Sequence, residues 1–202
     1  MTSHKSRSIV LNADVARNIL LKEAVVMLHE MFHLKELAVL EIINEKEGRW
    51  GFYRIGMTTH APEKKYKKGL AHIHFMGLSE AITAELEKKY FATILEIPAL
   101  QEEKERMRTG QTKKIIADVA QRENEAEDDI FWVSADGKDY ETFSYAIHRK
   151  VLNFLVKEIF ETYPDTFSSE DDVLNLFLRA QYGPGMPRLA KIFEATFGKD
   201  SF

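Results

Sequence analysis

The hydrophobic and polar positions in the first quarter of the chain predict one long helix. Residues 13–45 contain no proline or glycine, and their apolar residues leave little of a helix surface polar: Ile19, Leu20, Val25, Val26, Leu28, Phe32, Leu37 and Leu40. A helix that is apolar nearly all round is normally buried at the centre of a domain. We therefore expect a buried central helix over 13–45, preceded by a short strand over 7–12 in which Asn12 caps the helix.

The pattern after Gly48 predicts a short sheet and a second helix. Aromatic and β-branched side chains predict a strand over 49–57, and the basic polar stretch 58–69 predicts a loop. Residues 71–75 are expected to form a further strand. A helix is expected from about Ser79, because apolar residues recur at helical spacing up to Pro98: Ile82, Leu86, Tyr90 and Ile94.

Residues 101–130 differ from the rest of the chain because they are mostly charged. Their only apolar face is a weak one, formed by Ile115, Ile116, Val119 and Ala120. This pattern predicts a solvated helical excursion. Phe131-Trp132-Val133 and the Asp136–Gly137 turn then predict a small hairpin.

Three helices with clear end signals are expected to complete the chain, over 143–162, 170–181 and 187–197. The end signals are a Ser169/Asp172 capping box, Pro187 in a first helical turn, and Gly183 and Gly198 as C-terminal caps. We therefore predict a mostly helical α+β fold. One domain is expected over 1–202, made of a first part at 7–100, the charged excursion at 101–130 and a helical part at 131–202.

Composition narrows the classes of partner and compartment. The chain has 202 residues, 45% of them hydrophobic, which is enough for a substantial single core. Its 28 basic and 32 acidic residues give a net charge of -4, so we expect no attraction to nucleic acid or to anionic membranes. No apolar run is long enough for a membrane span and no secretory signal is evident, so a cytoplasmic protein is expected.

The chain contains no cysteine, which restricts any metal site to nitrogen and oxygen ligands. Disulfides, thiolate nucleophiles and the thiolate-rich sites of most structural zinc are thereby excluded. Three nitrogen or oxygen ligands with water in the fourth position are the usual arrangement of catalytic zinc.

The motif with the most chemical content is His29-Glu30-Met31-Phe32-His33, a His-Glu-x-x-His pentad. On a helix, positions four apart lie on one face one turn apart, so His29 and His33 can reach the same metal ion. Glu30 projects beside that face, where a general base next to a metal-bound water is needed. The alternative is that these are two histidines of an ordinary helix.

A zinc site needs at least one ligand beyond the two histidines. The candidates in the sequence are Glu80, the pair His72/His74, His60 and Glu85. Residues 77–85, Gly-Leu-Ser-Glu-Ala-Ile-Thr-Ala-Glu, resemble the Asn-Glu-Ala-Ile-Ser-Asp and Asn-Glu-Gly-Leu-Thr-Glu helices that supply the third zinc ligand in gluzincin metallopeptidases, the thermolysin-like group and its minimal relatives.

The gluzincin resemblance is carried by two motifs in the same order as in that family. It implies that His29 and His33 are the paired zinc ligands, Glu30 the catalytic base and Glu80 the carboxylate ligand. Residues 53–56, Tyr-Arg-Ile-Gly, are similar to the Arg-x-Gly strand of minimal gluzincins, and 144–152 and 197–198 are loosely similar to their C-terminal helical part. The implied fold is zincin-like, with a short sheet, a buried pentad helix and a C-terminal helical part.

The chemistry implied by the resemblance is hydrolysis of a peptide bond in a peptide or protein substrate. Zinc at the three ligands would lower the pKa of a bound water to about 7, and Glu30 would take its proton. The family also implies a Tyr or His that stabilises the oxyanion. Tyr145 is our choice, with His148 and Tyr90 as alternatives.

The chain departs from the gluzincin pattern in two places. Ala84 stands where the family commonly has an acidic residue that hydrogen-bonds a ligand histidine and orients it. Glu85 is the neighbouring substitute, and without one a non-catalytic metal-binding module, regulatory or for protein interaction, becomes the alternative function. Only 28 residues precede His29, so the sheet that normally lines the cleft is short, and a partner could complete an open cleft.

Overall fold

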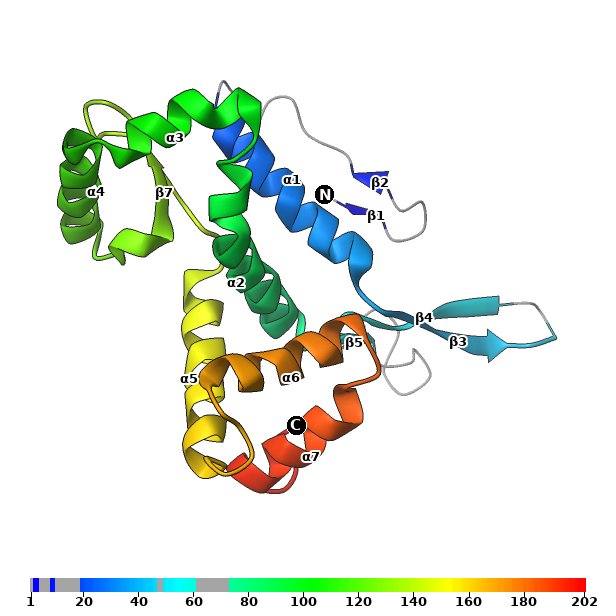
Figure 1. Ribbon diagram of the computed structural model, residues 1–202. Coiled ribbons are helices and arrows are strands. Elements are labelled where there is room, and N and C mark those ends of the chain that lie inside the picture. The colour runs from blue at the N-terminus through cyan, green and yellow to red at the C-terminus, as the bar shows by residue number, and fades with distance from the viewer. Residues whose placement is uncertain (1, 4–7, 10–18, 47–48, 61–72) are drawn as a thin grey trace. The chain divides into compact units, whose positions relative to one another are not determined.

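The computed structural model describes most of the chain, and the described part is mostly helical with small antiparallel sheets, which confirms the α+β prediction (Figure 1). The described residues are 2–3, 8–9, 19–46, 49–60 and 73–202. Contacts divide the chain into two compact units, one made of 1–34 and 83–146, the other of 35–82 and 147–202. Each unit therefore joins segments that are far apart in the sequence.

The pentad helix, α1, spans Leu20–Lys35 and is shorter than the predicted 13–45. Residues Ala38–Asn44 form strand β3 instead, so the prediction of helix there is wrong. The cause is tertiary: the N–H of Leu37 donates to the carbonyl of Gln181 (3.1 Å), and its carbonyl accepts from the N–H of Gly56 (3.0 Å). These bonds take Leu37 out of the helical ladder, and the β-branched residues that follow suit a strand.

The sequence pattern predicted a helix that is buried all round, whereas α1 is buried on one face only. Leu21, Val25 and His33 form its buried face, whereas Leu20, Val26, Met27 and Met31 are exposed. Of the predicted first strand, Ser8–Ile9 is strand β2, antiparallel to β1 at Thr2–Ser3. The rest of that strand, the Asn12 cap and residues 13–18 of the predicted helix lie outside the described residues.

The first unit contains most of α1 and the part of α2 from Thr83 onward. Helix α2 spans Met76–Ile94 and begins three residues before the predicted Ser79. The elements that follow α2 are η2 (Pro98–Leu100), α3 (Gln101–Arg108), α4 (Gly110–Glu123), η3 (Glu127–Asp129), β7 (Ile130–Val133) and β8 (Tyr140–Thr142). The predicted hairpin is therefore confirmed. The apolar core of the first unit is formed by Leu21, Val25, Ile94, Leu100, Phe131 and Phe143.

The charged segment 101–130 is helical, as predicted, but it is not merely solvated. Its weak apolar face packs on strand β7 and forms a small core of its own: Ile116, Val119, Ala120, Ile130 and Val133. Arg106 lies over the ring of Trp132, 5.6 Å from the ring centroid, and donates to the carbonyl of Val133. These contacts attach the segment to the β7–β8 hairpin.

The second unit holds a four-stranded antiparallel sheet in the sequential order β3-β4-β5-β6. Strands β4 (Arg49–Ile55) and β6 (Ile73–His74) agree with the two predicted strands, while β5 (Thr58–His60) lies where a loop was predicted. Three helices complete the unit close to their predicted ranges: α5 (Ala146–Thr162), α6 (Glu170–Tyr182) and α7 (Met186–Phe197). Ser169 caps α6 as predicted, because its side chain accepts from the N–H of Asp172.

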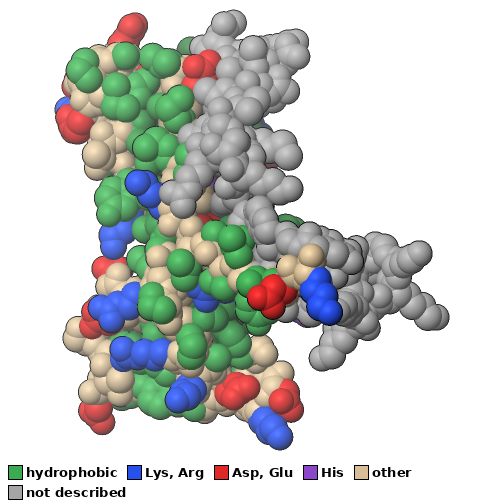
Figure 2. Space-filling model, turned by 90° about the vertical axis from the view of Figure 1, so that its right-hand side faces the viewer, with side chains coloured by type: hydrophobic (Ala, Val, Ile, Leu, Met, Phe, Trp, Pro, Cys, Tyr) green, Lys and Arg blue, Asp and Glu red, His purple; other side chains and the backbone are tan. Residues whose placement is uncertain are grey.

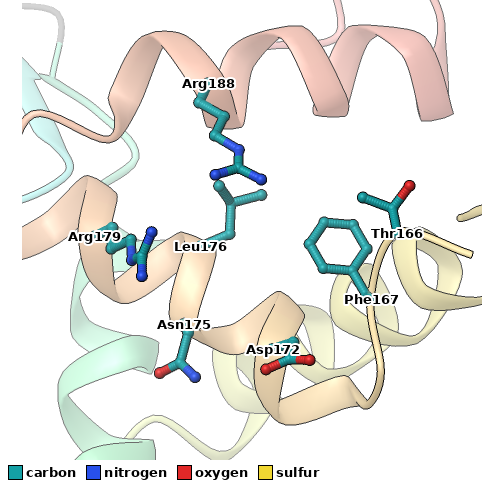
Figure 3. A pocket seen from close by; sticks show the side chains of 7 residues that line it. All are labelled: Thr166, Phe167, Asp172, Asn175, Leu176, Arg179 and Arg188. Atoms are coloured by element: carbon teal, nitrogen blue, oxygen red, sulfur yellow. The ribbon is translucent and has the colours of Figure 1, made fainter.

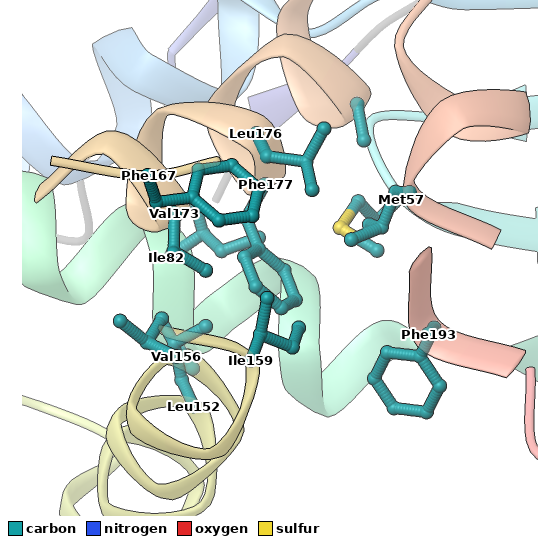
Figure 4. Close-up of a cluster of buried hydrophobic side chains, with 13 residues drawn as sticks. Met57, Ile82, Leu152, Val156, Ile159, Phe167, Val173, Leu176, Phe177 and Phe193 are labelled. Atoms are coloured by element: carbon teal, nitrogen blue, oxygen red, sulfur yellow. The ribbon is translucent and has the colours of Figure 1, made fainter. Parts of the chain in front are cut away.

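The core of the second unit gathers side chains from helices and from the sheet (Figure 4). Ile82 of α2, Ile159 of α5 and Phe177 of α6 are fully buried in it, and Met57 enters from the β4–β5 turn. A fully buried side chain of this size contributes about 1.5–3 kcal/mol to folding. This packing holds the first turns of α2, which carry Glu80.

A buried polar cluster anchors the start of α2. The carboxylate of Glu36 accepts from Gln181 Nε2 (3.1 Å) and from Ser79 Oγ (3.4 Å). Gly56, with φ of +59°, lies so close to this carboxylate that a Cβ there would be 2.7 Å from Glu36 Cδ. This crowding explains why a glycine stands at position 56, the glycine of the predicted Arg-x-Gly strand. Arg54 of the same motif donates to the carbonyl of Gly183 (2.9 Å).

The described surface carries side chains of every class. Basic, acidic and hydrophobic side chains are all exposed on the face drawn in Figure 2. Within the described ranges, every helix is too short or too polar to cross a bilayer.

Candidate metal centre

Helix α1 brings the two pentad histidines together on one face. Their Nε2 atoms are 3.1 Å apart and their ring centroids 4.8 Å apart, with the rings nearly perpendicular. Two nitrogens bound tetrahedrally at 2.0–2.1 Å from zinc would lie about 3.3 Å apart. The observed spacing therefore fits two ligands of one ion. His33 is buried, and the side chain of His29 is only 13% exposed.

The orientation of His29 is fixed by Glu87 on helix α2. Glu87 Oε2 lies 2.8 Å from His29 Nδ1, and Glu87 is only 2% exposed. A carboxylate can only accept, so the proton of a neutral His29 ring sits on Nδ1 and the lone pair sits on Nε2. That lone pair is directed to the same side as His33 Nε2. This carboxylate–histidine pairing is the arrangement that metal-ligating histidines commonly have.

Glu87 was missed by sequence reasoning, which looked for the partner at Ala84 and Glu85. Ala84 is fully buried and has no polar side chain. Glu87 follows Glu80 by seven residues, which is two helical turns, so both lie on one face of α2. That spacing was the signal in the sequence that could have identified it.

Glu80 is carried by the same continuous helix as Glu87. One nitrogen of each histidine and one carboxylate oxygen of Glu80 lie within 4.8 Å of one another. The donor set is two imidazole nitrogens and one carboxylate oxygen, which is the set found at catalytic zinc in several hydrolases. These three residues could hold zinc.

Glu30 lines a cavity of about 260 Å³ in the first unit, together with His29 and Glu87. The other lining residues are Lys22, Val25, Val26, Phe131, Glu141, Thr142, Ser144 and Tyr145. Helix α1 contributes Lys22, Val25, Val26 and His29 to one wall because these positions follow helical spacing. The β7–β8 hairpin and the residues after it form the other wall, so the cavity combines apolar and polar surface next to the predicted general base.

Tyr145 lies beside the histidine pair. Its ring is stacked on that of His29 at 16° between planes, with 6.0 Å between centroids, and its backbone has a φ of +59°. A positive φ is uncommon for a bulky residue, which indicates that the surroundings hold Tyr145 in this position.

The two alternatives to Tyr145 have other surroundings. The ring of Tyr90 lies 5.9 Å from that of Phe32, and Tyr90 does not line the cavity. The ring of His148 packs over Gly77, where a Cβ would lie 2.4 Å from His148 Cδ2. Tyr145 is thus the one of the three that lines the cavity with Glu30.

The remaining candidate ligands are not grouped with the histidine pair among the described residues. His74 is exposed on strand β6. His60 belongs to strand β5, but its side chain is outside the described part, as is all of His72. Glu85 is partly buried on α2 and does not line the cavity of Glu30.

Comparison of the chain with protein-family models, with curated proteins and with solved structures finds no match.

Proposed function

We propose that this chain is a zinc-dependent peptidase of the gluzincin type, with the metal held by His29, His33 and Glu80. One observation carries the proposal: the Nε2 atoms of His29 and His33 converge at 3.1 Å while Glu87 binds the other nitrogen of His29. A carboxylate oxygen of Glu80 lies within 4.8 Å of a nitrogen of each histidine. Two imidazole nitrogens and one carboxylate oxygen are a donor set that zinc prefers.

The ligand residues position the ion and the neighbouring residues act on the substrate. When bound, zinc would lower the pKa of a coordinated water to about 7 and polarise a peptide carbonyl. Glu30 would act first as a general base that takes a proton from the attacking water and then as a general acid that gives it to the leaving amine. Tyr145, whose ring lies beside that of His29, would donate a hydrogen bond from its hydroxyl group to the oxyanion.

The cavity of about 260 Å³ beside Glu30 gives a peptide substrate a place to bind. It offers apolar side chains (Val25, Val26 and Phe131) and an ion pair between Lys22 Nζ and Glu141 Oε1 at 2.5 Å. A mixed surface of this kind accommodates a side chain and the polar main chain beside it.

The contact between Glu87 and His29 weakens the argument for the alternative function, a non-catalytic metal-binding module. That alternative was motivated by Ala84, which leaves no acid at the usual position for orienting a ligand histidine. Glu87 supplies such a carboxylate from a different position on the same helix. The departure at Ala84 therefore gives no reason to expect a defective metal site.

The proposal is tested by the substitution Glu30→Gln, which removes the proton acceptor and keeps the size of the side chain. Cleavage of a degenerate peptide pool, followed by mass spectrometry, should fall at least about 100-fold, because general bases typically contribute 10²–10⁴-fold. The zinc content should stay unchanged. Glu23→Gln, an acid-to-amide change in the first turn of α1, is the matched control and should cleave like the unmodified chain.

Two results would contradict the assignment. Undiminished cleavage by Glu30→Gln would remove Glu30 from its role. Zinc binding without cleavage of any peptide by the unmodified chain would favour the non-catalytic metal-binding module instead.

A further inference from the structure

A pair of arginines lies in the second unit, far along the sequence from the metal centre. Arg179 belongs to α6 and Arg188 to α7, and both line a cavity of about 200 Å³ (Figure 3). A second cavity of about 660 Å³, next to the loop between the helices, shares both arginines. A water molecule occupies about 30 Å³ in the liquid, so even the smaller cavity has room for a group with several oxygen atoms.

The turn between α6 and α7 brings the backbones of the two helices that carry the arginines close together. The N–H of Gly185 donates to the carbonyl of Arg179 (3.1 Å), and the N–H of Arg188 donates to the carbonyl of Gly185 (3.1 Å). A Cβ at position 185 would lie 2.6 Å from the carbonyl carbon of Arg179, so only glycine permits this approach. The start of α7 is therefore held against the end of α6.

The charges of this pair are not neutralised within the described part of the chain. Neither guanidinium has an ion pair or side-chain hydrogen bond to another described residue. Asp172 is the one acid that lines the cavity of about 200 Å³, and its carboxylate is occupied by the N–H and the hydroxyl of Ser168. Figure 3 shows the guanidinium of Arg188 extending from α7 toward Leu176, with that of Arg179 beside the same side chain.

We infer that Arg179 and Arg188 form a binding site for a phosphate dianion, either free phosphate or a phosphate monoester. Two planar guanidinium groups offer paired N–H donors that match the oxygens of a phosphate group. A phosphate monoester carries nearly two negative charges near neutral pH, which balances two arginines, whereas a carboxylate carries one. This site is independent of the proposed peptidase activity.

The test is a titration of the isotopically labelled chain with inorganic phosphate, O-phosphoserine and acetate at constant ionic strength, followed by backbone amide NMR. Saturable shifts are expected at residues 166–190 with both phosphate compounds or with one of them. Arg179→Gln and Arg188→Gln should each weaken binding about tenfold, because a charge-assisted hydrogen bond is lost. Lys191→Gln removes an equal charge from the same helix but not from the cavity and should bind like the unmodified chain.

The outcomes separate the two sources of phosphate and the failure of the inference. Saturation by O-phosphoserine identifies a phosphate monoester as the ligand, and saturation by inorganic phosphate alone identifies free phosphate. Absence of saturable shifts overturns the site, as does binding that survives in the Arg179→Gln/Arg188→Gln double variant. Equal binding of acetate overturns the choice of a dianion. Because both arginines are exposed, unchanged unfolding midpoints are expected for these variants.

Discussion

The carboxylate of Glu87 decides which nitrogen of His29 can bind a cation. Glu87 Oε2 accepts a hydrogen bond from Nδ1–H of His29 (2.8 Å), so the lone pair of the neutral ring is on Nε2, which faces His33. Without this partner, the neutral imidazole could place its proton on either nitrogen and could rotate. The geometry of the proposed metal centre thus depends on a residue that is not one of the three proposed ligands.

Replacing Glu87 by glutamine should lower zinc affinity about 10- to 100-fold, the usual cost of losing a carboxylate behind a ligand histidine. Isothermal titration with zinc and a competing chelator measures the loss, and the circular dichroism spectrum should be unchanged. Glu85→Gln, two residues away on the same helix, is the control and should keep its affinity. Equal affinities of the Glu87 and Glu85 variants would show that Glu87 does not orient His29.

Gly56 combines a positive φ with crowding around the position of a Cβ, so its backbone tolerates substitution poorly. Gly56→Ala places a Cβ 2.7 Å from Glu36 Cδ at a φ of +59°, so we expect a loss of more than about 1 kcal/mol in unfolding free energy. Gly110→Ala is the control, because a Cβ there meets nothing within 4 Å. Chemical denaturation should distinguish the two, and equal stabilities would contradict the crowding at Gly56.

At the scale of elements, local signals predicted the helices that end in clear caps. The Ser169 cap and Pro187 placed α6 and α7 to within a residue or so, because these residues satisfy or tolerate unpaired groups at helix ends. The C-terminal end of α1 had no such signal. Its apolar pattern continues into β3, and only the bonds of Leu37 to Gln181 and Gly56 show where the helix stops.

The Ser169 cap can be tested directly. Ser169→Ala removes the acceptor for the N–H of Asp172, so we expect a loss of about 1 kcal/mol in unfolding free energy. Denaturant titration measures the loss. Ser201→Ala, an exposed serine near the C-terminus, should be neutral. A neutral effect at Ser169 as well would mean that the cap does not contribute to the stability of α6.

The candidate site was only partly predictable from the sequence. The pentad gives the two histidines and Glu30, because helical spacing alone puts them on adjacent faces. The spacing of Glu80 and Glu87 puts both on one face of α2, but the pairing of Glu87 with His29 and the wall of the cavity formed by β8 have no local signal. They depend on how α2 and the β7–β8 hairpin pack on α1, which no local pattern encodes.

At the scale of the whole molecule, zinc should stabilise the folded chain, because the proposed ligands come from two helices and converge only when both are formed. At a free zinc concentration 100 times the Kd, binding contributes about 2.7 kcal/mol. For a chain of this length that corresponds to a rise in Tm of roughly 5–11 °C. Thermal unfolding of metal-stripped protein with and without zinc measures it, and His33→Ala should show no rise.

The most direct test of the metal centre is the zinc content of protein purified without chelators, measured by elemental mass spectrometry. We predict about one zinc per chain in the unmodified protein and in Glu30→Gln, and a large loss in His29→Ala, His33→Ala and Glu80→Gln. Absence of stoichiometric metal from the unmodified chain, or full zinc content in the Glu80→Gln variant, would contradict the proposed centre.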